Sequence, residues 1–204
     1  MATEQSRDFS ASPWTIRPAH RSDITHLPAI ERAAAQRYVP YLPQLGLISD
    51  QLKNIVSLGF LHRALQQNHL WVAMAQKTHP PARSAPIGFI VVDRLNHGFF
   101  VVELDVLPDY GRQGIGSALV NQVIEAACHQ RLKTVTLTTF RHVPWTIPFY
   151  RQLGFEIVLP ADYTPDIRAI VNHEERHGFS RQVRVVMQCQ IPPPSPAPIP
   201  FSLS

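Results

Sequence analysis

A glycine-rich turn lies between a strand-like stretch and a helical pattern, and its residue types suit it to hold a phosphate group. Gly111, Gly114 and Gly116 follow an apolar, β-branched run over 99–107, and apolar residues at helical spacing follow over 115–127. Glycine permits positive φ and lets the backbone approach a bulky anion closely. The N–H groups of such a turn and the positive end of the helix dipole point to the same place. The turn therefore predicts phosphate or diphosphate binding.

Two common phosphate-binding loops do not fit this turn. A Walker loop needs lysine and then serine or threonine after its last glycine, but Gly116 is followed directly by Ser117. The dinucleotide fingerprint has the order GxGxxG, with an acidic residue about 20 positions later. Here the order is GxxGxG, and the next strand ends at 138–140 without an acid. Neither a P-loop nucleotide site nor a dinucleotide site is predicted.

A second motif, HEERH at 173–177, has the spacing of a zinc-binding helix. His173 and His177 share one face of a helix expected over Thr164–His177. A metalloprotease also needs a third ligand, and after His177 only Cys189 could supply it. We interpret the motif as a solvated helix face with charge pairs four residues apart, and we predict no metal site.

Hydrophobic periodicity, prolines and glycines predict the elements that must position these motifs. Strands are expected at 14–17, 70–75, 87–93, 99–107, 133–138, 155–159 and 183–190. Helices are expected at 22–34, 49–66, 115–127 and 164–177, with a short one inside 143–153, and the segment 38–46 is expected to be irregular. The strands first form an antiparallel meander and then alternate with helices. This order predicts an α/β (α+β) fold: a mixed, largely antiparallel central sheet of about seven strands, with helices on both faces.

Length and composition indicate one soluble domain. The 204 residues are 45% hydrophobic and have a net charge of +4 from scattered basic side chains, which does not favour nucleic-acid binding. The two cysteines have no metal or redox spacing, and there is neither an apolar leader nor an apolar run of membrane length, so a cytoplasmic protein without a membrane partner is expected. The domain is expected over 13–190, between a disordered segment, 1–12, and a disordered proline-rich tail, 191–204.

Three motifs together carry a family resemblance. The strand over 103–107 leads into PDYGRQGIGSAL at 108–119, PFYRQLGFEIV follows at 148–158, and a strand ending in IRPA at 16–19 opens the domain. This combination resembles the GNAT N-acetyltransferase superfamily over roughly 14–190. The resemblance implies an acyl-CoA-dependent N-acyltransferase whose two central strands splay apart. Many relatives pair through their last strands, so the resemblance also allows a homodimer.

The resemblance further implies where acetyl-CoA binds. Pantetheine would pair with the strand near 104–107, and the diphosphate would lie on the loop 111–117. The implied contacts are Leu104, Val106, Leu107, Gly111, Arg112, Gln113, Gly114, Gly116, Ser117 and Tyr150. Tyr150 matches the tyrosine that protonates the leaving thiolate. Two positions depart from the pattern: Gly111 stands where glutamine or arginine is usual, and Val143 stands where an asparagine commonly contacts the pantetheine arm.

Amine acetylation needs a base, because an alkylammonium group has a pKa of about 10. Glu103 is the first candidate, since it is an acid inside an apolar strand beside the expected thioester, where burial raises a carboxyl pKa towards neutrality. Asp105 lies on the same face by the period of a strand and is the second candidate. An ordered water could also relay the proton. A backbone N–H near Val106 could stabilise the developing oxyanion.

The acceptor pocket is expected between the first two helices and their connection. Glu31, Tyr38 and Tyr41 are candidate wall residues, together with Asp105, because aromatic faces and carboxylates suit a cationic amine. The segment Ala161–Ser180 is expected to close the other side. The expected reaction moves an acetyl group from acetyl-CoA to a primary amine of a small molecule. The alternative is a non-catalytic acyl-CoA sensor or interaction protein on the same scaffold.

Overall fold

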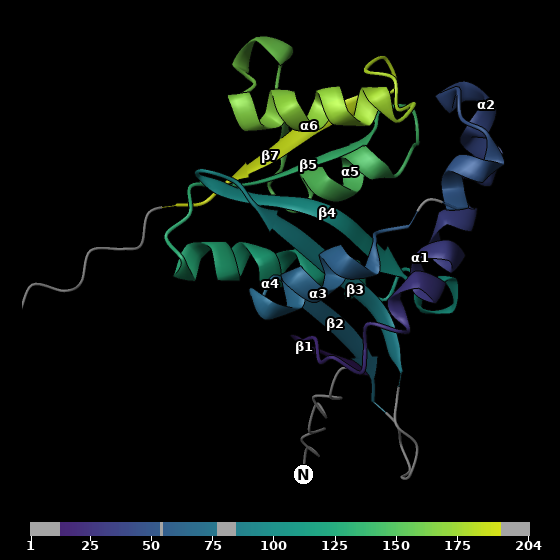
Figure 1. The fold of residues 1–204 in the computed structure, drawn as a ribbon, viewed down its shortest axis with the longest axis vertical. Coiled ribbons are helices and arrows are strands. Elements are labelled where there is room, and N and C mark those ends of the chain that lie inside the picture. The colour runs from purple at the N-terminus through teal and green to yellow at the C-terminus, as the bar shows by residue number, and fades with distance from the viewer. Residues whose placement is uncertain (1–12, 54, 77–84, 193–204) are drawn as a thin grey trace, which may run out of the picture.

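A computed structural model of the chain describes residues 13–53, 55–76 and 85–192 (Figure 1). The strands are β1 (Trp14–Pro18), β2 (Leu70–Ala75), β3 (Pro86–Arg94), β4 (Gly98–Val106), β5 (Thr134–Phe140), β6 (Glu156–Ile157) and β7 (Arg184–Gln190). The α-helices are α1 (Leu27–Ala35), α2 (Leu42–Leu45), α3 (Leu58–Gln66), α4 (Ile115–His129), α5 (Thr146–Arg151) and α6 (Pro165–Arg176). Short 3-10 helices are η1 (Gln36–Tyr41), η2 (Ser49–Lys53), η3 (Pro108–Tyr110) and η4 (Pro160–Asp162). The segment 1–12 and residues 193–204 of the expected tail lie outside the described residues.

The strands form one seven-stranded sheet in the order β1-β2-β3-β4-β5-β7-β6. Neighbouring strands are antiparallel, except that β4 and β5 run parallel. This arrangement confirms the mixed, largely antiparallel sheet that the order of elements predicted. The bounds of β2 coincide with the predicted 70–75, whereas β6 is shorter than the predicted 155–159.

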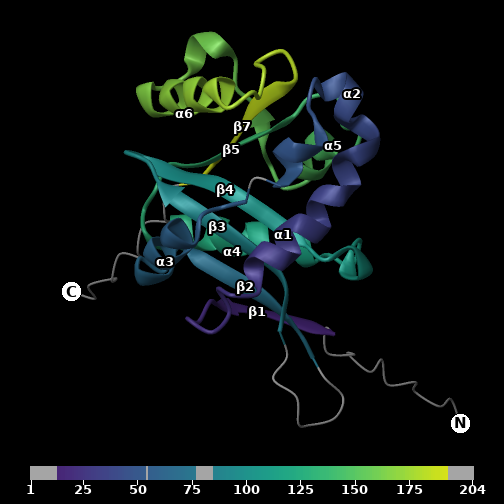
Figure 2. The same cartoon turned by 45° about the vertical axis from the view of Figure 1, so that its right-hand side comes forward.

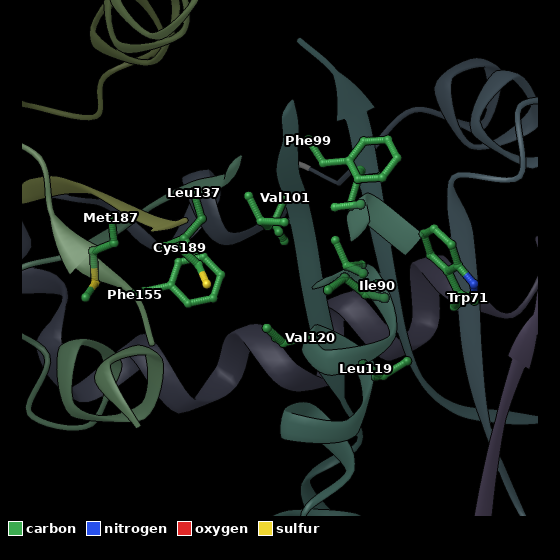
Figure 3. Packing of buried hydrophobic residues seen from close by; sticks show 14 of the residues in the cluster. Trp71, Ile90, Phe99, Val101, Leu119, Val120, Leu137, Phe155, Met187 and Cys189 are labelled. Atoms are coloured by element: carbon green, nitrogen blue, oxygen red, sulfur yellow. The ribbon is translucent and has the colours of Figure 1, made fainter. Parts of the chain in front are cut away.

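Helices cover both faces of the sheet. On one face, α1 and α3 pack against β2 and β3. The buried side chains there include Leu27, Ile30, Leu61, Val72 and Phe89. On the other face, α4 contributes Leu119 and Val120 to the cluster that contains Val101 and Leu137 of the central strands (Figure 3). Helix α6 packs on Val186 of β7, on the same face as α1 and α3. Among the described residues, no helix is both long enough and apolar enough to cross a membrane.

The segment 49–66 differs from the single helix that its apolar spacing predicted. It forms η2 and then the separate helix α3, where the Ser57 side chain caps the helix by accepting a hydrogen bond from the Phe60 N–H (3.2 Å). Both carboxylate oxygens of Glu31 accept from the Val56 N–H (3.0 and 3.1 Å). This bond between distant segments uses an N–H that a continuous helix would need, so the helix is interrupted there.

Helix α1 begins later than its sequence predicted. Residues 21–26 form turns, and the helix starts at Leu27. Asp23, inside the range expected for the helix, pairs its carboxylate with Arg17 of β1 (2.7 Å). The segment 38–46, expected to be irregular, forms η1 and α2.

The pairing of the two central strands stops halfway along them. Residues Gly98–Val101 of β4 pair with Thr134–Leu137 of β5, and their ladder ends there in the described residues. A bulge shifts the register of β4 against β3 at this point, between Val91 and Val92. Figure 2 shows β4 and β5 separating towards the side where α1 lies. This is the splay that the family resemblance implied.

Replacing Gly98 by alanine is expected to destabilise the fold by about 1–3 kcal/mol, the usual cost of overpacking. A Cβ at position 98 would overlap the backbone oxygen and the side chain of Thr134, where the central strands still pair. Thermal denaturation should show a Tm lower by roughly 2–12 °C. The control is Gly59→Ala on α3, where a Cβ meets nothing within 4 Å, and its Tm should hold or rise. Equal Tm values for the two variants would refute this view of the β4–β5 contact.

Candidate active site

Two carboxyl groups of β4 lie on one face of the sheet, beside the splay. Glu103 pairs with Val91 and Asp105 pairs with Phe89 of β3, and directly paired residues of an antiparallel ladder project to the same face. Val91 and Phe89 belong to the buried cluster under α1 and α3. Both acids therefore project towards α1, which confirms the expectation that they share a face.

The backbone of β4 presents hydrogen-bonding groups along its open edge. The Leu107 N–H donates to the Ile87 oxygen (2.8 Å), on the β3 side. Successive residues of a strand direct their N–H groups to alternate edges, so Val106 and Leu104 direct theirs to the β5 side. The β4–β5 ladder has already ended at this level. An extended amide chain could pair along this edge as an added strand does.

The loop after β4 leads directly into the N-terminus of α4. Of the three glycines singled out in the sequence, Gly114 alone adopts positive φ (+80°), while Gly111 is extended and Gly116 lies inside α4. The second left-handed position is Arg112 (φ +58°). Gly114 is the N-cap of α4 and no side chain caps this helix. The N–H groups of its first turn, which includes Ser117, are therefore available to an anion.

Neighbouring elements fix the position of this loop. The Trp14 Nε1–H of β1 donates to the Gln113 oxygen (3.2 Å). A Cβ on Gly116 would lie 3.4 Å from the ring of Phe149 on α5, at van der Waals distance, so the start of α4 lies against α5 here. This packing brings the loop next to the helix that carries Tyr150.

Three carboxyl groups around the splay interact electrostatically. Burial raises the pKa of Glu103 to about 7. Burial and the neighbouring Glu103 raise the pKa of Glu31 on α1 to about 8. Burial, Glu103 and Glu31 raise the pKa of Asp105 well above its usual range, and its Oδ2 is buried with no hydrogen-bond partner among the described residues. Carboxyl groups tuned this way can take up a proton near neutral pH.

Tyr150 is held on α5, beside the end of β5. Its ring packs against Phe149 (4.9 Å between centroids) and Phe155 (5.7 Å). The Thr146 hydroxyl donates to the Phe140 oxygen (2.6 Å), which ties α5 to β5. Burial, and then nearby phenol and carboxyl groups, raise the pKa of Tyr150 above its usual range. The phenol is therefore protonated at physiological pH and can donate a proton.

The connection after α1 packs onto α5 and the end of β5. The Tyr38 ring contacts Phe140 (5.3 Å between centroids) and Trp145 (6.0 Å), and Tyr41 packs edge-on against Trp145 (5.0 Å). Burial raises the pKa of Tyr38 to about 12, and the two β4 acids act in the same direction. The expected wall residues thus separate: Tyr38 lies near the acids, and Tyr41 belongs to the aromatic packing. Glu31 is only 6% exposed, so it does not line an open pocket wall.

Two arginines that the sequence analysis did not identify also act on the site. Arg37 of η1 lies over the Trp145 ring (5.2 Å) and lowers the pKa of Asp105. Arg184, the first residue of β7, lowers the pKa of Glu103. Neither arginine belongs to a motif, and only the folded chain brings them to the splay.

The HEERH motif lies at the end of α6, and its acids have basic partners. Glu174 pairs with Arg184 (2.8 Å), and Glu175 pairs with Arg181 (2.8 Å). The rings of His173 and His177 lie 4.2 Å apart between centroids. In the part of the chain that the structure describes, no group of three His, Cys, Asp or Glu side chains is arranged to hold a metal ion. Glu174 of the motif therefore forms an ion pair with a residue of the sheet, Arg184 of β7.

Known proteins share this fold. The sequence model of the acetyltransferase (GNAT) domain family matches residues 66–157. The structure resembles N-acetylglutamate synthase from Neisseria gonorrhoeae, complexed with coenzyme A and N-acetyl-glutamate, with a TM-score of 0.61 and 15% identity. That match covers 88% of this chain and 35% of the synthase, so the chain spans about a third of that protein's length.

Two smaller proteins match over nearly their full length. One is the ribosomal-protein-S18-alanine N-acetyltransferase of Escherichia coli, with a TM-score of 0.58 and 17% identity over 92% of this chain and 99% of that one. The other is the PaiA N-acetyltransferase of Thermoplasma acidophilum, in complex with coenzyme A, with a TM-score of 0.59 and 17% identity over 87% of this chain and 98% of that one. At these identities the likeness is one of fold.

Proposed function

This chain belongs to the GNAT superfamily, and from that premise we propose that it is an acetyltransferase acting on a primary amine of a small molecule. In this proposal acetyl-CoA is the donor, and the amine attacks its thioester directly. The observation that carries the proposal is the end of the β4–β5 ladder at Val101 and Leu137. Beyond that point an open strand edge lies beside three carboxyl groups and leads into an uncapped helix N-terminus.

The proposed donor site uses the backbone of β4 and the loop after it. The N–H and C=O groups of Val106, with the C=O of Leu104, suit the amides of a pantetheine arm, which would add to β4 as a strand does. The loop 111–117 suits the diphosphate, because its left-handed Gly114 opens the α4 N-terminus towards an anion. The backbone N–H of Val106 would stabilise the negative charge that develops on the thioester oxygen.

In the proposed chemistry, Glu103 acts on the acceptor amine and Tyr150 acts on the leaving thiolate. Glu103 takes the proton of the acceptor ammonium, directly or through a water molecule, so that the amine nitrogen can form the new C–N bond. The C–S bond then breaks, and Tyr150 donates its phenolic proton to the leaving thiolate. The adduct nitrogen loses its second proton, which returns to Tyr150 through water, and Glu103 releases its proton to solvent. The products are therefore the amide, free CoA and one proton.

The proposed acceptor side is acidic and partly aromatic. Asp105 and Tyr38 lie near Glu103, and the buried carboxyl of Glu31, whose pKa is raised to about 8, also interacts with Glu103. Carboxylates and an aromatic face favour an acceptor that arrives as a cation.

A screen for free CoA tests the proposed function. The full chain is incubated with acetyl-CoA and a panel of primary amines, and a thiol reagent reports CoA release. We expect saturable release with at least one amine. Tight acetyl-CoA binding without thiol release for any amine would contradict the proposal and favour an acyl-CoA sensor.

Replacing Gly114 by alanine is expected to weaken CoA binding about tenfold, measured by titration calorimetry. Position 114 requires a φ of +80°, which costs a residue with a Cβ roughly 1–2 kcal/mol. A loop that relaxes from this conformation no longer directs its N–H groups at the diphosphate. The control is Gly46→Ala after α2, which also has positive φ (+63°) in open space and should keep its CoA affinity. Wild-type CoA affinity in both variants would exclude the loop as the diphosphate site.

A further inference from the structure

Arg184 is a half-buried cation held in one place by several contacts. Its guanidinium donates to the Thr138 hydroxyl of β5 (2.6 Å) and to both carboxylate oxygens of Glu174 on α6 (2.8 and 3.3 Å). The guanidinium also lies over the rings of Phe140 (4.7 Å) and Phe179 (5.4 Å). The side chains of Arg184 and Glu174 are each 17% exposed, so this pair is less screened by water than a surface pair.

The register places this cation on the face of the sheet that carries the acids. Arg184 pairs directly with Phe140, and Val186 pairs with Thr138, so these side chains share one face of β5 and β7. Tyr38, which follows α1, packs on the same Phe140 ring. Helix α1 also covers the face to which the two β4 acids project. Arg184 and the acids therefore lie on the same face of the sheet, with β5 between their strands.

The charged and titratable groups around Glu103 come from every element that borders the site. They are Glu31 of α1, Arg37 and Tyr38 of η1, Asp105 of β4, Tyr150 of α5 and Arg184 of β7. Most of these groups are acids or phenols, whose interactions with Glu103 oppose its ionisation. A backbone hydrogen bond with Leu104, and then the charge of Arg184, act in the opposite direction and lower the pKa of Glu103.

We propose that Arg184 is a positioning residue for the acetyl transfer proposed above: its fixed charge favours the ionised form of Glu103, which is the form that can act as the base. Glu174 holds the guanidinium in place and neutralises part of its charge. This role accounts for Glu174, the first acid of the HEERH motif, which pairs with Arg184 of the sheet.

The test is the dependence of kcat/KM on pH, measured by CoA release with an accepted amine. Removing the charge should raise the pKa of Glu103, so Arg184→Gln should shift the acidic limb upward by about 0.5–1 pH unit. At pH values below this pKa, kcat/KM of Arg184→Gln should be about 3- to 10-fold lower than that of the wild type. Arg184→Lys keeps the charge and should restore most of the wild-type profile. Glu174→Gln removes a negative charge beside Arg184, and its limb should move to lower pH.

A matched control lies in the connection between α6 and β7. Arg181 pairs with Glu175 and Asn172 on α6, in a more exposed position, and Arg181→Gln should leave the profile unchanged. A uniform loss of kcat/KM at every pH in Arg184→Gln, or a Lys variant no better than the Gln variant, would overturn the inference and indicate a structural role. If Arg184→Gln does not fold, an unshifted Glu174→Gln profile also overturns it. In each case the wild-type enzyme still releases CoA, whereas failure of the proposed function would abolish release in the wild type itself.

Discussion

Replacing Tyr150 by phenylalanine is expected to lower kcat about 100-fold or more, the usual contribution of a positioned general acid. The substitution removes one hydroxyl and keeps the ring, whose contacts with Phe149 and Phe155 hold α5 in place. The affinity for acetyl-CoA and the Tm should therefore stay close to those of the wild type. Single-turnover CoA release, monitored with a thiol reagent, separates this chemical step from substrate binding.

Two further tyrosines make this prediction specific. Tyr163 lies beside α6, where Arg141 and Arg181 are its basic neighbours, and Tyr163→Phe should leave kcat unchanged. Tyr38 lies in the acid cluster, and its phenol interacts with that of Tyr150. If Tyr150→Phe keeps a rate within about twofold of the wild type while Tyr38→Phe loses activity, the proton donor is Tyr38 and the assignment of Tyr150 is wrong.

Replacing Glu103 by glutamine is expected to lower kcat/KM about 100- to 1,000-fold near neutral pH and to remove the acidic limb of its pH profile. Glutamine keeps the shape of the side chain but cannot accept the ammonium proton. Asp105→Asn is the matched comparison on the same strand face and should cost less. The reverse order of the two losses would make Asp105 the base.

Glu103→Gln, which should lower activity, is expected to raise stability as pH rises. Burial raises the pKa of Glu103 from 4.5 to about 7, so in that window the folded state binds more protons than the unfolded state. The free energy of unfolding of the wild type therefore falls as pH rises through the window. Glu103→Gln lacks this titration and should gain stability relative to the wild type as pH rises, in urea unfolding followed by circular dichroism. If ionisation of Glu103 instead stabilised the folded state, Glu103→Gln would lose stability relative to the wild type as pH rises.

Local signals made much of this fold predictable from the sequence. The Thr164 side chain caps α6 by accepting from the Ile167 N–H (3.3 Å), as its type and the following proline indicated. Gly154 adopts positive φ (+83°) after α5, as expected for a helix that ends at glycine. The glycine turn and the FYRQLGF motif are local patterns of a few residues each, and their spacing along the chain carried the family resemblance.

The remaining features depend on contacts between distant segments. The helix expected over 49–66 is broken where Glu31 binds the Val56 N–H, and no local pattern reveals that bond. Arg184 has no motif around it, and its role emerges only where β7, β5 and α6 meet. Val143 stands where relatives commonly have asparagine, and it is buried in the core (1% exposed), which its apolar type alone suggested.

Amide hydrogen exchange, measured residue by residue by NMR with and without acetyl-CoA, tests most directly whether the open edge of β4 and the loop 111–117 hold the donor. We expect the Val106 N–H and the loop amides to exchange more slowly on binding. The slowing should approach about 100-fold at an acetyl-CoA concentration 100 times Kd. Amides on the β3 side of the strand, such as that of Leu107, already donate within the sheet and should change less. Saturating acetyl-CoA that leaves Val106 and the loop unchanged while protecting residues elsewhere would contradict this assignment.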